Sequence, residues 1–145
     1  MSNIDIGRLI TVKDKLEAAR AGALLRLSTD YAHAIGLITQ GYPGVETQSW
    51  TRQASDARRH LVWVEAGSQG DAPATELLSA IWSARAAGGI SETMTELSQK
   101  VLAKDGQYSA VVGTLTGRRH AAEALIEAAD SLSDLNSITW DFSLG

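Results

Sequence analysis

The segment from Glu92 to Asp130 constrains the fold of this chain more than any other feature of the sequence. Its apolar side chains recur at steps of three, four and seven residues. Over roughly five heptads, this spacing is typical of a helix packed along a bundle or coiled coil. The stripe consists of Met94, Leu97, Val101, Tyr108, Val111, Leu115, Ala122, Leu125 and Ala129, with Lys104 and Arg118 at the positions between. We therefore predict one long helix, capped by Ser91, that either kinks near residues 105–106 or belongs to an elongated molecule.

The same periodicity predicts three shorter helices before this one, over residues 11–39, 45–66 and 74–87. A Pro-Gly turn at residues 43–44 and a polar, glycine-containing linker at residues 67–71 separate them. We expect Thr11 to cap the first helix and Pro73 to lie in the first turn of the third.

These elements predict an all-α fold, an elongated antiparallel helical bundle of about four helices. The chain of 145 residues is long enough for one core, so we expect a single helical domain over residues 11–138. Residues 1–10 are expected to form an N-terminal arm. Residues 131–138 can add one short helical turn, and residues 139–145 alternate apolar and polar side chains as an extended C-terminal tail.

Composition and charge exclude several classes of function. The formal net charge is -4 and there is no cysteine, so we expect no nucleic-acid partner, no disulfide and no thiolate metal site. No run of about 18 apolar residues occurs and residues 1–8 lack a signal-peptide pattern, so no membrane partner is expected. His33, His60 and His120 have no second ligand at metal-binding spacing, and no catalytic motif is present. We expect Glu92 and Glu96 on a solvated helix face, and a protein that is not an enzyme.

Two basic triplets, at residues 58–60 and 118–120, are the main charge clusters. Arg58, Arg59, Arg118 and Arg119 are candidates to bind an acidic patch on a partner. The alternative is that the triplets line helix flanks and pair with the nearby carboxylates of Asp56 and Glu123.

Three aromatic residues are further candidates for partner binding. Trp63 lies beside the apolar stripe of its helix and can extend that stripe into a contact surface. Trp140 and Phe142 are two residues apart in the extended tail, so both project to the same side. Either they dock on a partner, where buried tryptophans dominate binding, or the tail folds back on its own helices.

Three segments together resemble small helical proteins of phage and prophage tail-fibre modules. Ile4–Thr11 is similar to the family's opening "IDlsRLiTae.K", and Tyr42–Arg58 is similar to "YP..E..SW..Q..EA..". Residues 97–121 are similar to "el..rVlaKad.y...vG...GrRqalEdai.aA". Matching positions include Tyr42 and Trp50 in the second segment and Lys104 in the third.

The resemblance implies a non-enzymatic protein without a cofactor, which assists tail-fibre assembly or stays bound to the fibre or baseplate. Its partner would be a tail-fibre or baseplate protein, and self-association is left open. It would work in the bacterial host cytoplasm during assembly or in the virion tail. The alternative is a small phage-encoded helical regulator that binds a host protein through the four arginines.

Overall fold

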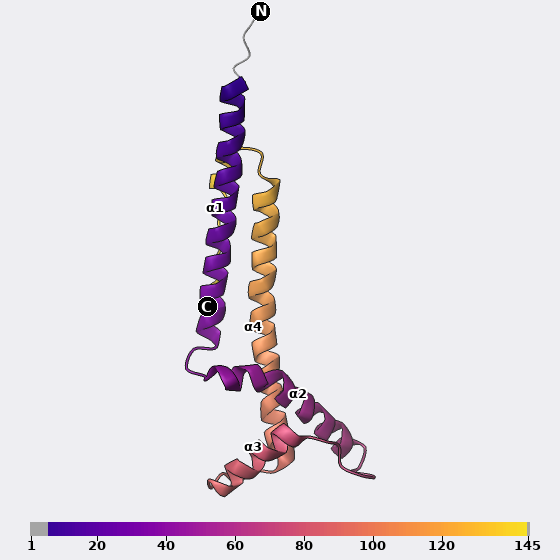
Figure 1. The fold of residues 1–145 in the computed structure, drawn as a ribbon. Helices are drawn as coiled ribbons and strands as arrows, with labels where there is room; N and C mark the ends of the chain where they lie inside the picture. Colours follow the sequence, from indigo (N-terminus) through magenta and orange to yellow (C-terminus); the bar gives the residue numbers. More distant parts are fainter. Residues whose placement is uncertain (1–5, 145) are drawn as a thin grey trace, which may run out of the picture. The chain divides into compact units, whose positions relative to one another are not determined.

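In the computed structural model, all secondary structure of the described residues is helical, which confirms the predicted all-α class. The structure describes the backbone of residues 6–144 and the side chains of residues 11–144. In chain order the helices are α1 (Ile6–Ile38), α2 (Gly44–Glu65), α3 (Glu76–Ala87), α4 (Met94–Ala128) and α5 (Leu132–Asn136) (Figure 1).

The helices belong to two compact units. That they form a single domain over residues 11–138 stays a prediction. Unit 1 contains the chain up to Ile38 and from Val111 onward, and unit 2 contains residues 39–110. Helix α4 therefore contributes its first half to unit 2 and its second half to unit 1.

In unit 1, α1 and the second half of α4 run antiparallel (Figure 1). Arg20 on α1 donates hydrogen bonds to the carbonyl oxygens of Ile126 (3.3 Å) and Ala129 (2.7 Å). These carbonyls lie at the end of α4, where the regular hydrogen bonds of the helix run out, and the Ile126 carbonyl also accepts a 3.4 Å bond from the Ala129 amide. Tyr31, further along α1, shares a 2.9 Å hydrogen bond with Thr116, earlier in α4. The core of the unit consists of Ala23, Leu27, Ala122, Ile126, Ala129 and Leu135.

Unit 2 is built from α2, α3 and the first half of α4 around Ala57, Leu78 and Leu97. Helices α2 and α3 end in the same way, because Gly67 (φ 87°) and Gly89 (φ 99°) adopt a left-handed conformation directly after each helix cap. The next amide then reaches back to the last turn, from Ser68 to Trp63 O (3.0 Å) and from Ile90 to Arg85 O (3.0 Å). These are Schellman motifs, and they set where the loops to α3 and α4 begin.

Three predicted helix starts differ from the structure. Helix α1 begins at Ile6, so Thr11 is not its cap and only residues 1–5 of the expected arm lie outside the described chain. Helix α3 begins at Glu76, three residues after Pro73. Helix α4 begins after Thr93, not Ser91, because Thr93 and Glu96 form a capping box with backbone-to-side-chain bonds of 3.1 and 3.2 Å. Helix α4 is assigned without a break from Met94 to Ala128.

The predicted apolar stripe of α4 is wrong at one position near its end. Leu125 is 57% exposed, and the buried residue is its neighbour Ile126. The stripe positions at seven-residue steps, Leu115, Ala122 and Ala129, are buried as predicted. Ile126 follows Ala122 by four residues, so it lies on the same helix face and takes the place predicted for Leu125.

One buried polar group in α4 lacks a hydrogen-bond partner among the described residues. The Ser98 side chain is fully buried and its Oγ is unpaired. An unpaired buried hydroxyl costs about 1–3 kcal/mol. We therefore expect Ser98→Ala to raise the free energy of unfolding by about 1 kcal/mol in urea titrations. Ser79→Ala is the matched control, because Ser79 Oγ bonds to Thr75 (2.9 Å) and its loss should not stabilise. Destabilisation by Ser98→Ala would contradict this account.

Candidate functional site

The C-terminal tail packs on the helices of unit 1, which is the second of the two arrangements considered for it. Trp140 and Phe142 both lie against the core of the unit. The Trp140 indole donates a 2.9 Å hydrogen bond to Asp30 Oδ2. The Phe142 ring meets Tyr31 edge to face, with ring centroids 5.9 Å apart. Partner binding by these two aromatic residues stays a prediction.

Arg118 and Arg119 are both engaged close to this tail. Arg118 donates to the carbonyl oxygens of Asp141 (3.3 Å) and Ser143 (2.7 Å). Bonds from the backbone and side chain of Ser143, together with the charge of Arg118, hold the pKa of the Asp141 carboxyl below its usual range. Arg119 pairs with Glu123 (2.9 Å), as the alternative interpretation of the triplets predicted. Unit 1 therefore gathers four of the seven candidate residues around its tail.

The other three candidates line a shallow groove on unit 2, which we call the Trp63 groove. Its volume is about 440 Å³, and it is lined by Arg58, Arg59, Val62, Trp63, Ala66, Asp71 and Pro73. Both arginines already have acidic partners: Arg58 pairs with Asp105 (2.8 Å) and Arg59 pairs with Asp56. Val62 is 65% exposed and gives this groove its accessible apolar surface.

A larger groove, which we call the α2–α4 groove, crosses α2, α3 and the first half of α4. Its volume is about 650 Å³, within the range of about 300–1,000 Å³ common for ligand pockets. It is lined by Pro43, Val45, Glu46, Ser49, Gln53, Leu77, Ile81, Arg85, Leu97, Lys100, Val101 and Lys104. Of these residues, Leu97 and Val101 were predicted to lie on the apolar stripe of residues 92–130, and none was predicted to form a binding surface. The available signal was that Leu97 and Val101 are four residues apart and are each followed three residues later by a lysine, Lys100 and Lys104.

An aromatic cluster adjoins this groove. Trp50 meets Tyr42 and Tyr108 edge to face, with ring centroids 5.1 and 5.3 Å apart. Lys104 Nζ lies 4.0 Å from the centre of the Tyr42 ring and 4.6 Å from that of Trp50. Cation–π contacts of this kind contribute about 0.5–1 kcal/mol where they are exposed. The cluster holds the start of α2 against α4 and fixes the position of a positive charge.

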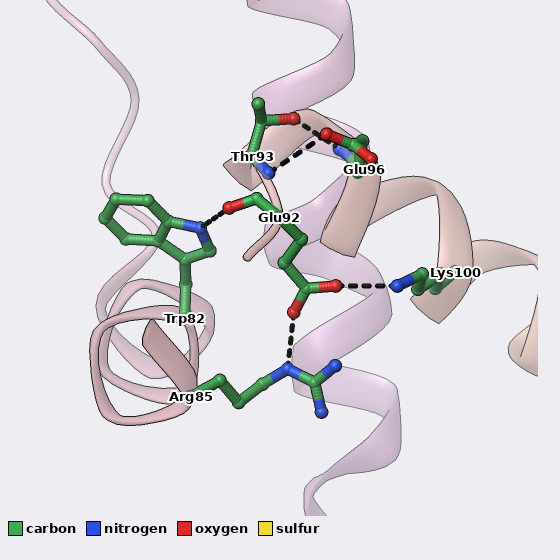
Figure 2. A network of polar contacts seen from close by, with 6 residues as sticks. All are labelled: Trp82, Arg85, Glu92, Thr93, Glu96 and Lys100. Carbon is green, nitrogen blue, oxygen red and sulfur yellow. Dashed lines mark hydrogen bonds and ion pairs between the residues drawn. The ribbon is translucent and has the colours of Figure 1, made fainter. Parts of the chain in front are cut away.

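Glu92, expected on a solvated face, is instead the buried centre of a polar network (Figure 2). Only 2% of its side chain is exposed, and its carboxylate accepts bonds from Arg85 (2.5 Å) and Lys100 (2.8 Å). Its carbonyl oxygen accepts a 2.9 Å bond from the Trp82 indole. The hydrogen bond from Arg85, then that from Lys100, lowers the pKa of Glu92 from 4.5 to about 2. Glu92 therefore joins the end of α3 to the start of α4 as an anion.

The lowered pKa of Glu92 predicts that the folded protein loses stability in acid. Because the folded pKa of Glu92 is depressed, its contribution to stability is complete above pH 4.5 and is lost as the pH falls towards about 2. We expect the urea midpoint of the wild type to fall across this interval. Glu92→Gln should flatten that dependence, and Glu65→Gln, at an exposed position on α2, should keep it. If the urea midpoint of Glu92→Gln falls with pH as steeply as that of the wild type, Glu92 is not the cause of the acid sensitivity.

Among the described residues, no three metal-ligating side chains of His, Asp or Glu lie together. Within the same part of the chain, no helix has the length and apolar character needed to cross a membrane. No protein-family model, no curated protein and no solved structure matches this chain.

Proposed function

We propose that this chain is a non-enzymatic phage tail protein that assists tail-fibre assembly or remains bound to the fibre or baseplate. The partner is a tail-fibre or baseplate protein, and the function needs no cofactor. The protein acts in the bacterial host cytoplasm during assembly, or in the virion tail.

The observation that carries this proposal is the meeting of two segments that resemble the tail-fibre-module family. From the segment that begins at Tyr42, the side chains of Glu46, Trp50 and Gln53 line a small hollow of about 50 Å³ beside the α2–α4 groove, with which it shares four residues. Val101, Lys104 and Tyr108, from the segment around residues 97–121, line the same hollow. These segments are far apart in the sequence, so their convergence supports a shared role for the matching residues.

The physical mechanism is the covering of exposed apolar surface. A fibre subunit exposes apolar surface until it trimerises, and such surface drives aggregation. The α2–α4 groove offers apolar side chains with a polar rim, as interfaces between proteins do. Its occupation by a segment of the fibre protein would keep that segment out of water until assembly, or afterwards in the finished tail.

Co-expression with a tail-fibre protein from the same genome tests this function. We expect the fibre protein to be more soluble in the presence of this chain and to co-purify with it. The proposal fails if the fibre folds equally well alone and the two never co-purify. A pull-down from host lysate that recovers a host protein, and no tail protein, would instead support a regulator. Detection of the chain in purified virions would select the structural role.

A further inference from the structure

We infer that the α2–α4 groove binds an acidic amphipathic helix of the partner protein. The inference rests on the proposed function, since it gives the chemistry of the segment that the same groove would hold.

The groove has an apolar floor that crosses three helices. Leu97 and Val101 come from α4, and Leu77 and Ile81 come from α3. Each pair is separated by four residues, so it lies on one helix face. On the α2 side, Val45 is 82% exposed, the most exposed of the large apolar side chains. An occupant must therefore bring an apolar stripe of its own.

The charges along the groove favour an anionic occupant. Three cations, Arg85, Lys100 and Lys104, line it together with a single carboxylate, that of Glu46. The Glu92 carboxylate below them is buried and its two oxygens are occupied, while the side chain of Lys100 stays 62% exposed. No carboxylate of the described residues forms a salt bridge with Lys104, which is held by aromatic rings instead. This positive rim lies on a chain whose net charge is -4.

The walls of the groove select a helical segment. Protein segments commonly dock either by adding a strand to a sheet edge or by laying an amphipathic helix into a groove. The described residues contain no strand, so unit 2 offers no sheet edge. Helical walls with apolar residues at four-residue steps match a helix whose anchors repeat at three and four residues. Acidic residues beside that stripe would face Lys104 and the exposed side chain of Lys100, since Arg85 is already paired with Glu92.

Fluorescence anisotropy with two labelled helical peptides tests the inference. Each peptide has roughly four turns with leucine along one face, and the flanks carry glutamate in one and lysine in the other. We expect full-length protein to bind the glutamate peptide, with an affinity that falls as salt rises from about 0.05 to about 0.5 M. Binding of both peptides with equal affinity, or of neither, would overturn the inference.

Substitutions at one exposed valine separate charge from loss of apolar contact. Val45→Glu should weaken binding of the glutamate peptide by about tenfold or more, and Val45→Lys by no more than about threefold. Val12→Glu is the matched control, because Val12 is 58% exposed and lies on α1 in unit 1. Equal loss with Val45→Glu and Val45→Lys would overturn the charge argument. If Val62→Glu weakens binding of the glutamate peptide and Val45→Glu does not, the peptide binds in the Trp63 groove and the inference is wrong.

The two proposals fail in different ways. If the fibre protein co-purifies with wild type and with Val45→Glu alike, the inference is wrong and the proposed function stands. If the glutamate peptide binds as expected but no tail protein co-purifies, the proposed function is wrong and the groove chemistry stands. Self-association that Val45→Glu abolishes, with no binding of the peptide, would show that a second copy of the chain occupies the groove.

Discussion

We expect Asp56→Ala to lower the free energy of unfolding by about 3 kcal/mol, measured by urea titration with circular dichroism and tryptophan fluorescence. Asp56 on α2 is only 1% exposed. Its Oδ2 accepts a 3.1 Å hydrogen bond from the amide of Leu78, in the first turn of α3, and its Oδ1 pairs with Arg59. The first amides of a helix have no partner within the helix. Alanine would leave the buried Leu78 amide without an acceptor and Arg59 without a counter-charge.

Two further variants make this prediction specific. Asp56→Asn keeps an oxygen for the Leu78 amide but removes the charge and the oxygen that pairs with Arg59, so about half of the lost stability should return. Arg52→Ala is the matched control, because Arg52 also lies on α2 and reaches α3 through an exposed 3.8 Å ion pair with Glu76. Exposed pairs contribute about 0–1 kcal/mol. If Asp56→Ala costs no more than Arg52→Ala, Asp56 does not cap α3.

The sequence was sufficient to predict the contacts that depend on neighbours along one helix. The pairs of Arg59 with Asp56 and of Arg119 with Glu123 lie three and four residues apart, and both are present. The start of α4 was predicted at Ser91, although the sequence favours Thr93. Thr93 and Glu96 have the spacing of a capping box, whereas Ser91 has a methionine three residues later.

Contacts between distant residues could not be predicted in this way. Asp56 and Leu78 are separated by the loop after Gly67, and no local pattern indicates that this aspartate caps α3. Glu92 was expected in water because its neighbours in the sequence are polar. It is buried because Arg85 from α3 and Lys100 from α4 meet at its carboxylate (Figure 2). The α2–α4 groove was missed for the same reason, since its walls come from three helices.

The tail gives the second large effect. We expect deletion of residues 139–145, and Trp140→Ala alone, to lower the stability of unit 1, with about 2 kcal/mol for the single substitution. Substitution of a completely buried tryptophan by alanine costs about 3–5 kcal/mol of stability. The expected loss is smaller here because Trp140 is only partly buried. The loss combines the contact of the indole with the unit 1 core and its hydrogen bond to Asp30. Thermal unfolding followed by circular dichroism measures it.

The matched control is Leu144→Ala, because Leu144 lies in the same tail and is 56% exposed. Its substitution should leave the melting temperature close to that of the wild type, since exposed side chains contribute within about 0.5 kcal/mol. Trp140→Phe removes the bond to Asp30 and part of the ring contact, so its loss of stability should lie between zero and that of Trp140→Ala. Co-purification of the fibre protein, measured on the same variants, tests the partner role of the tail. A tail deletion that leaves thermal stability unchanged and abolishes co-purification would show that Trp140 and Phe142 serve the partner rather than the fold.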